Sequence, residues 1–145
     1  MVRFPRLYER LAVAVSGLGP RSRLRRSLVR RGTVSGWAAF SRRDFELMTV
    51  RYAPDVEFQF SPGLQTLGLN ATYRGRAAML DGLRELAAEW DPIELDPAYV
   101  VDLGDVVVNL GYIRARGRTS GVRVDTELAQ VLVLRQGLVA SDRGR

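Results

Sequence analysis

The order of the amphipathic segments in the last two thirds of the chain constrains its fold more than any single motif does. Polar and apolar residues alternate over residues 54–60, which is the period of a strand with one buried face. An apolar stripe at helical spacing follows over residues 76–90, and three long extended runs come next, at 93–102, 106–116 and 122–135. Sequential strands of this length pair antiparallel and bend as their twist accumulates. The sequence therefore predicts an α+β fold in which a strongly bent, mostly antiparallel sheet wraps around helices.

The composition excludes several kinds of catalytic site. The 145 residues are 46% hydrophobic and 26% charged, which suits one domain with a sizeable core. All 22 basic residues are arginine, and the chain has no lysine, histidine or cysteine. Imidazole bases, thiolate nucleophiles, Schiff-base lysines and His or Cys metal sites are therefore impossible. Because the acidic residues are scattered along the sequence, we expect a site without metal or cofactor.

The positive charge is concentrated at the start of the chain. The first 43 residues hold eleven of the 22 arginines against a single acid, Glu9. The run from Arg21 to Arg31 indicates either a contact for nucleic acid or an anionic surface, or a solvated helix face around Leu24 and Leu28. We favour the solvated face, because no aromatic residue is interleaved for base stacking.

Three segments are expected along the chain. A break at residues 17–20 separates an accessory helix or frayed leader, residues 1–20, from a single domain at residues 21–140. Residues 141–145 are predicted to form a disordered tail. No apolar run is long enough for a signal-peptide core or for the about 20 residues of a membrane span. With no cysteine available for disulfides, the cytoplasm is the expected compartment.

Five short motifs occur in an order that resembles one known family. The motifs are Arg43-Asp44, Tyr52-Ala53-Pro54-Asp55, Tyr73-Arg74-Gly75-Arg76, Asp102-Leu103-Gly104-Asp105 and Gly117-Arg118-Thr119-Ser120-Gly121. With the helical start of the domain, they resemble the SnoaL-like branch of the nuclear transport factor 2-like superfamily, over roughly residues 21–139. The resemblance implies a conical α+β half-barrel of the cystatin-like kind, with helices closing a deep pocket. It also implies a homodimer formed through the outer surface of the sheet.

The resemblance does not choose a reaction, because members include ketosteroid isomerases, polyketide cyclases, dehydratases and epoxide hydrolases. The isomerase pattern needs a carboxylate base and hydrogen-bond donors for an enolate oxygen. Its base falls on Phe60, its helical tyrosine donor on Gly36 and its acidic donor near Gln130, so all three groups are missing. The histidine used by many cyclases and dehydratases is absent as well. The arginine between two aspartates that serves epoxide hydrolases has no inward-facing counterpart.

The same comparison and the strand period predict which side chains line the pocket. If Phe60 and Gln130 point inward, alternate residues of their strands do so too. The predicted ligand-binding residues are Trp37, Phe40, Phe58, Phe60, Thr126, Leu128 and Gln130. They would form an apolar, aromatic slot with Gln130 and Thr126 as its polar groups, suited to a flat apolar molecule held by one or two hydrogen bonds. A filled core without a cavity is the alternative interpretation of the same residues.

Glu127 is, besides Gln130, the second candidate for a catalytic role. It lies on the opposite phase of its strand, and a β-bulge that shifts the phase by one residue would bring it into the slot with a raised pKa. Without such a bulge, Asp125 and Glu127 are expected to pair on the outer surface with one of three arginines, Arg114, Arg116 or Arg123.

The sequence leaves two features of the strands open. Asn109 is a cavity group only if its face of strand 106–116, opposite to that of Tyr112, is the inner one. After the Gln136-Gly137 turn, a stub at residues 138–140 is all that we expect of the final strand, which makes this strand look truncated beside the family. A frameshift or a strand swapped from a partner would explain such an end, and an unpaired sheet edge would follow from it.

Two functional hypotheses follow from the sequence. The first is a pocket domain that binds a small apolar metabolite, with activity, if any, of the cofactor-free isomerase, cyclase or dehydratase type. The second is a non-catalytic interaction or dimerisation module with a vestigial pocket and an arginine-rich N-terminal contact surface. Salt distinguishes them, because binding through several arginines weakens steeply with ionic strength and binding in an apolar pocket does not.

Overall fold

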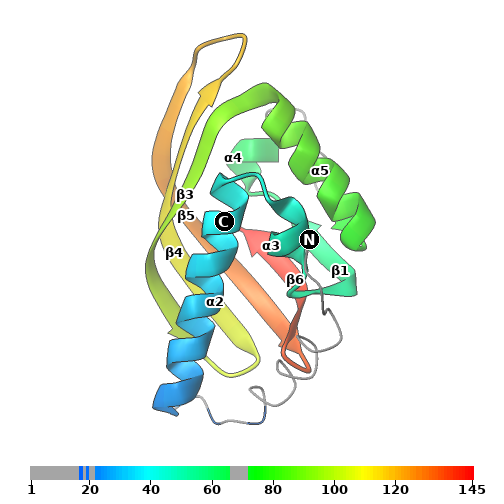
Figure 1. Cartoon of the computed structure of the whole chain (residues 1–145), viewed down its shortest axis with the longest axis vertical. Coiled ribbons are helices and arrows are strands. Elements are labelled where there is room, and N and C mark those ends of the chain that lie inside the picture. The colour runs from blue at the N-terminus through cyan, green and yellow to red at the C-terminus, as the bar shows by residue number, and fades with distance from the viewer. Residues whose placement is uncertain (1–16, 18, 20–21, 66–71) are drawn as a thin grey trace.

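A six-stranded sheet curls around helices that cover one of its faces (Figure 1). The computed structural model describes residues 17, 19, 22–65 and 72–145. The predicted accessory helix or leader at residues 1–20 lies outside the described residues except for residues 17 and 19. The predicted α+β fold, with a bent and mostly antiparallel sheet wrapped around helices, is confirmed. No helix in the described ranges is long and apolar enough to cross a membrane.

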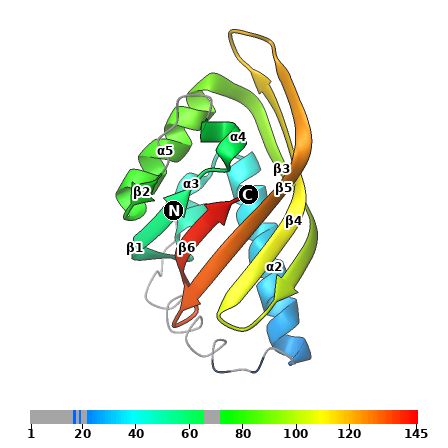
Figure 2. The same ribbon diagram turned by 180° about the vertical axis from the view of Figure 1, so that it is seen from behind.

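The sheet consists of a half with three long strands and a half with three shorter ones, in the order β2-β1-β6-β5-β4-β3. The strands are β1 (Tyr52–Gln59), β2 (Tyr73–Arg74), β3 (Trp90–Asp102), β4 (Val106–Gly117), β5 (Arg123–Arg135) and β6 (Leu138–Gly144). Neighbouring strands are antiparallel except for β1 and β6, which run parallel. Figure 2 shows β6 between β1 and β5, so this strand joins the two halves.

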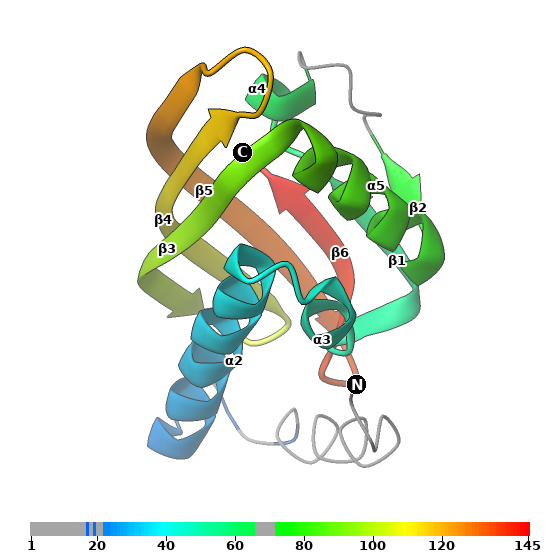
Figure 3. The ribbon, with the colours of Figure 1, turned by 45° about the horizontal axis from the view of Figure 1, so that its top comes forward.

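The described residues form four helices, which pack inside the curve of the sheet or at its rim (Figure 3). They are α2 (Arg23–Ser41), α3 (Phe45–Thr49), α4 (Pro62–Gln65) and α5 (Arg76–Glu89). Asp44 begins α3 as expected, since its Oδ1 accepts a hydrogen bond of 3.2 Å from the backbone N–H of Leu47. Leu83 and Leu86 of the predicted apolar stripe of α5 are buried, and each of these side chains contributes about 1.5–3 kcal/mol on leaving water.

β6 is longer than the sequence predicted. Gln136 and Gly137 have φ angles of 52° and 78°, the backbone of the two-residue hairpin turn that matches strand twist. The following strand then pairs with β5 on one side and β1 on the other. The predicted stub at residues 138–140 and disordered tail from residue 141 are therefore wrong: residues 141–144 satisfy their backbone hydrogen bonds within the sheet.

One extra residue in β6 decides which of its side chains face the helices. The pairing with β5 steps over Ala140, which makes this residue a β-bulge. Val139 and Asp142 are consequently both buried, although they are three residues apart in a strand. The β4–β5 ladder keeps one register along its whole length, so the bulge that would have turned Glu127 inward does not occur.

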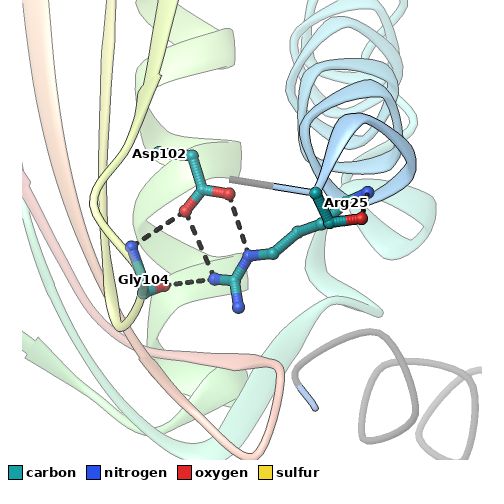
Figure 4. Close-up of polar contacts among 4 residues, drawn as sticks. Arg25, Asp102 and Gly104 are labelled. Atoms are coloured by element: carbon teal, nitrogen blue, oxygen red, sulfur yellow. Dashed lines mark hydrogen bonds and ion pairs between the residues drawn. The ribbon is translucent and has the colours of Figure 1, made fainter. Parts of the chain in front are cut away.

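A buried ion pair ties the start of α2 to the end of β3 (Figure 4). The guanidinium of Arg25 donates from Nε to Asp102 Oδ2 at 2.9 Å, and from Nη2 to Asp102 Oδ1 at 3.2 Å and to the carbonyl of Gly104. The backbone N–H of Gly104 also donates to Asp102 Oδ1 at 3.0 Å. With side chains only 6% and 4% exposed, the two charges compensate each other away from water.

Candidate functional site

A cavity of about 50 Å³ lies between the sheet and the helices. Its walls are mostly apolar, and Asp142 is the ionisable side chain among the residues that line it. The lining residues are Phe40, Met48, Phe58, Gln59, Phe60, Ser61, Leu83, Leu86, Leu95, Ile113, Leu128, Gln130, Asp142 and Gly144. At 10–15 Å³ or so for each water-sized group, the cavity takes a few such groups.

Two aromatic rings line the wall of the cavity near the end of β1. Phe58 and Phe60 meet edge to face with ring centres 4.9 Å apart, and Phe60 and Tyr73 do so at 5.7 Å. These are the favourable geometries for ring pairs, which makes the wall rigid as well as apolar. Phe58 is also the cross-strand neighbour of Asp142, so the carboxyl group emerges directly beside this wall.

Asp142 is 1% exposed and is held by two neutral donors. The Tyr52 hydroxyl donates to Oδ2 at 2.6 Å, and Gln130 Nε2 donates to the same oxygen at 2.7 Å. No hydrogen bond from a described residue reaches Oδ1. The second carboxyl oxygen is therefore the one left to meet a molecule in the cavity.

Burial raises the pKa of Asp142 to about 7. The hydrogen bonds from Tyr52 and Gln130 and the positive charge of Arg51 oppose this rise without cancelling it. Burial, with the negative charge of Asp142 as a further cause, also raises the pKa of Tyr52 well above its usual value, so this hydroxyl stays protonated and keeps donating. Near neutral pH, Asp142 is thus present in both protonation states, which suits a group that exchanges protons.

A chain of polar side chains runs behind Gln130, away from the cavity. Gln130 Oε1 accepts hydrogen bonds from Trp37 Nε1 at 3.1 Å and from Asn109 Nδ2 at 3.0 Å. Asn109 Oδ1 in turn accepts one of 2.9 Å from the Thr33 hydroxyl. All of these side chains are buried, and all find partners, as buried polar groups must to avoid a desolvation cost.

A second, smaller cavity of about 10 Å³ adjoins this chain, with room for about one water. Arg51 contributes to its wall and lies in a notch of α2 formed by Gly32 and Gly36, donating to the carbonyl of Gly32. A Cβ at Gly36 would lie 2.7 Å from Arg51 Nη1. The glycine at the expected tyrosine position thus makes room for the guanidinium of Arg51, the residue before β1.

Five of the seven predicted ligand-binding residues line the main cavity: Phe40, Phe58, Phe60, Leu128 and Gln130. Trp37 lies behind Gln130 instead and borders the smaller cavity. Thr126 is exposed and does not line the cavity, so its predicted place in the slot is wrong. The binding role of the other residues stays a prediction.

The phase left open by the sequence is settled by burial. Asn109 faces the helices and is 1% exposed, whereas Tyr112 is 42% exposed on the outer face. Glu127 is exposed on that outer face too. Asp125, two residues earlier in the strand, has its Oδ1 3.9 Å from Arg114 Nε. The catalytic role considered for Glu127 is therefore excluded by its position.

Asp142 and Tyr52 are the site residues that sequence reasoning missed. The sequence places Asp142 in the predicted tail. If the strand continued instead with a period of two from Val139, the side chain of Asp142 would point outward. A bulge was considered, but in β5 and not in β6, where it occurs at Ala140. The available signal was the position of Asp142 three residues after Val139. This spacing places both side chains on one face only if a bulge lies between them.

Comparison with known proteins places this geometry in a family. The sequence pattern of the SnoaL-like domain matches residues 36–141. No curated protein matches the sequence. Among solved structures, the chain is similar to a nuclear transport factor 2-like protein of unknown function from Burkholderia pseudomallei, with 22% identity, a TM-score of 0.72 and 80% and 88% of the two chains covered.

Two further structures share the fold. TerC, co-crystallised with polyporic acid, has 23% identity, a TM-score of 0.70 and coverage of 79% of this chain and 88% of its own. A protein of ketosteroid isomerase-like fold from Catenulispora acidiphila, in complex with trimethylamine, has 15% identity, a TM-score of 0.68 and coverage of 79% and 83%. At these identities the structures establish the fold, whereas the match over residues 36–141 establishes the family. The chain belongs to the SnoaL-like domain family.

Proposed function

We propose that the main cavity binds a small, mostly apolar molecule with one oxygen acceptor, and that Asp142 exchanges a proton with it. The observation that carries the proposal is the placement of one ionisable group, with Oδ1 unbonded among the described residues, in a mostly apolar cavity with an aromatic wall. Such a pocket gains most of its affinity from apolar contact and its orientation from one polar group. The cavity volume of about 50 Å³ favours a small ligand.

The arrangement around Asp142 favours chemistry that begins with proton donation. In the protonated form the proton resides on Oδ1, because Oδ2 already accepts from Tyr52 and Gln130. An enolate-forming isomerisation would need donors for the enolate oxygen, and these two donors are already engaged by the carboxyl group. Cofactor-free dehydration or cyclisation, in which an acid protonates a ligand oxygen, makes fewer demands on the site.

The similar structures support a ligand in this cavity. Polyporic acid is the compound crystallised with TerC, and trimethylamine is bound by the protein from Catenulispora acidiphila. Both proteins share the fold that encloses the cavity here. A small organic ligand is therefore the kind of molecule that this fold accommodates in its relatives.

A pair of probes of nearly equal shape tests the proposal. Acetone carries a carbonyl oxygen and isobutene does not, both are small enough for a cavity that takes a few water-sized groups, and NMR titration of the Phe58 and Phe60 ring signals measures the affinity of each. At pH 5.5, where Asp142 is mostly protonated, we expect acetone to bind about fivefold more tightly, the worth of one neutral hydrogen bond. The preference should shrink above pH 8 and vanish in Asp142→Leu. Equal affinities of the wild type for both probes at pH 5.5 would refute the proposal.

Gln130→Ala provides a second measure on the same probes. Removal of the amide takes away one donor to Asp142 and enlarges the cavity on its polar side. Gln130 also lines the cavity, so its amide can meet the oxygen of the ligand, and we expect the affinity for acetone to fall by about 1–2 kcal/mol and that for isobutene to change less. Unchanged affinity for acetone would remove Gln130 from the site.

A second candidate function, pairing of two copies through the outer face of the sheet, is favoured by exposed apolar residues there. These are Tyr99, Val101, Leu110, Tyr112 and Val133. A groove of about 520 Å³ lies along Tyr99, Leu110 and Tyr112. Large exposed apolar patches mark interaction sites in soluble proteins. We propose a homodimer through this face, and we expect light scattering to give a dimeric mass that Tyr112→Arg reduces to that of one chain.

The arginines of α2 offer the alternative contact. Arg23, Arg26, Arg30 and Arg31 are exposed on a helix whose first turn contains no acid. If they bind an anionic partner, the affinity for it must fall steeply between low and moderate salt, whereas the binding of acetone and the dimer of apolar faces should change little.

A further inference from the structure

Trp37 is the one member of the buried polar chain whose hydrogen-bonding direction is fixed by its chemistry. An indole N–H can only donate, whereas an amide can turn over and a hydroxyl can rotate. Trp37 is 3% exposed, and its Nε1 lies 3.1 Å from Gln130 Oε1. Whatever oxygen or nitrogen faces this N–H must therefore be an acceptor.

This requirement propagates through the chain in both directions. Because Gln130 must turn its Oε1 to Trp37, its Nε2 must face Asp142, where it donates at 2.7 Å. Because Oε1 also contacts Asn109, that residue must present its Nδ2, and its Oδ1 is left to accept from Thr33. One indole N–H thus sets which group donates in four hydrogen bonds: its own to Gln130, that of Asn109 to Gln130, that of Thr33 to Asn109, and that of Gln130 to Asp142.

The indole ring is itself held in one place by the backbone opposite it. Gly111 of β4 lies against the ring, and a Cβ at this position would be 2.6 Å from Trp37 Cζ3. The absence of a side chain at Gly111 lets the ring approach the strand closely. The ring cannot be shifted toward β4, so the N–H keeps its aim at Gln130.

We propose that Trp37 is a positioning residue: its indole N–H locks the amide of Gln130 so that Gln130 donates to Asp142 Oδ2 and leaves Oδ1 as the oxygen that exchanges the proton. This rests on the proposed function of Asp142. Trp37 touches neither the main cavity nor the carboxyl group, so it acts entirely through Gln130. Its expected role as a ligand contact is replaced by one behind the site.

The consequence of losing the lock can be stated in advance. Without the indole N–H, Gln130 can turn its Oε1 toward Asp142, which removes a donor from the carboxylate and gives the protonated carboxyl an acceptor. Both effects favour the protonated form of Asp142. One hydrogen bond to a charged group corresponds to a rise of about one to two units in its pKa. The other charged or titratable groups that act on Asp142, Tyr52 and Arg51, remain in place.

The test is an NMR titration of the Asp142 side-chain carboxyl carbon in the wild type and in Trp37→Phe. We expect a midpoint about one to two pH units higher in the variant. Trp90→Phe is the matched control, because it removes the other indole of the chain and lines neither cavity; its midpoint should equal that of the wild type. A wild-type midpoint near 4 would refute the proposed function, whereas equal midpoints in the wild type and Trp37→Phe would refute the lock alone.

Two further measurements keep the test decisive if Trp37→Phe folds poorly. In the Trp90→Phe background, 3-benzothienylalanine at residue 37 replaces the N–H by sulfur and keeps the ring shape, so the same rise in the midpoint is expected. Gln130→Met removes the amide, and in this background benzothienylalanine at residue 37 should change the midpoint no further. A further rise in the Gln130→Met background would show that Trp37 does not act through Gln130, and it would overturn the proposal.

Discussion

Asp102 and Asp142 are two buried carboxyl groups that the fold treats in opposite ways. Asp102 meets the guanidinium of Arg25 with two hydrogen bonds and accepts a third from the backbone of Gly104 (Figure 4). Asp142 has two neutral donors among the described residues, and both reach the same oxygen. The first carboxylate has its charge neutralised in place, and the second does not. The difference separates a group that fastens two elements from one that is available for proton exchange.

The largest effect should come from breaking the compensated pair. Arg25→Met leaves the carboxylate of Asp102 buried without its cation, and we expect the free energy of unfolding at pH 7 to fall by about 3–5 kcal/mol. Urea denaturation followed by circular dichroism measures the loss. Arg26→Met, an exposed arginine of the same helix, is the control and should leave the stability nearly unchanged.

The double variant Arg25→Met with Asp102→Leu sharpens this result. Removal of both charges takes away the cost of an unpaired buried carboxylate, so the double variant should be more stable than Arg25→Met alone. If the free energy of unfolding lost by the double variant equals the sum lost by the two single variants, the two charges do not compensate each other.

The uncompensated carboxyl should make stability depend on pH in the opposite sense to that of an ion-paired acid. A pKa raised to about 7 means that the folded state holds a proton that the unfolded chain releases near pH 4, so the contribution of Asp142 is fully present below pH 4 and is lost as the pH rises to about 7. At about 1.4 kcal/mol for each pH unit, the loss amounts to roughly 4 kcal/mol.

Asp142→Asn isolates this contribution. Asparagine stays neutral, and its amide oxygen can take the place of Asp142 Oδ2 and accept from Tyr52 and Gln130. The free energy of unfolding of the variant relative to that of the wild type should therefore rise by roughly 4 kcal/mol between pH 4 and pH 8. Unfolding in urea at several pH values gives the difference, in which the other carboxyl groups cancel. A difference independent of pH would mean that Asp142 titrates normally and resembles no proton-exchanging group.

Tyr52→Phe should have a smaller effect that also depends on pH. The variant loses the 2.6 Å hydrogen bond to Oδ2, which matters more to the carboxylate than to the neutral acid. We expect a loss of about 1 kcal/mol at pH 5 and of about 1.5–3 kcal/mol at pH 8, with the pKa of Asp142 moving upward. An equal loss at both pH values would mean that the strength of the Tyr52 hydrogen bond does not depend on the protonation state of Asp142.

The same two acids show what the sequence could reveal. The motif Asp102-Leu103-Gly104-Asp105 and the alternation of β3 and β4 predicted a turn where one occurs, but nothing in the sequence paired Asp102 with Arg25, 77 residues away. The aromatic wall at Phe58 and Phe60 followed from a period of two. The carboxyl group did not, because the β-bulge at Ala140 breaks that period in a strand that had been assigned to a tail. Bulges are set by pairing across the sheet, which one strand does not record.

The smallest effect should come from a third carboxyl, Asp55, whose partner is equally close but lies in water. Asp55 is exposed, and a hydrogen bond from Arg135 holds its pKa below the usual value. Its contribution to stability is present above pH 4 and is lost as the pH falls, but water and salt screen it. Arg135→Gln should therefore raise the pKa of Asp55 to its ordinary range, as followed by NMR, while the urea midpoint at pH 7 stays within experimental error. If the midpoint fell as far as in Arg25→Met, burial would not be what separates a fastening ion pair from a surface contact.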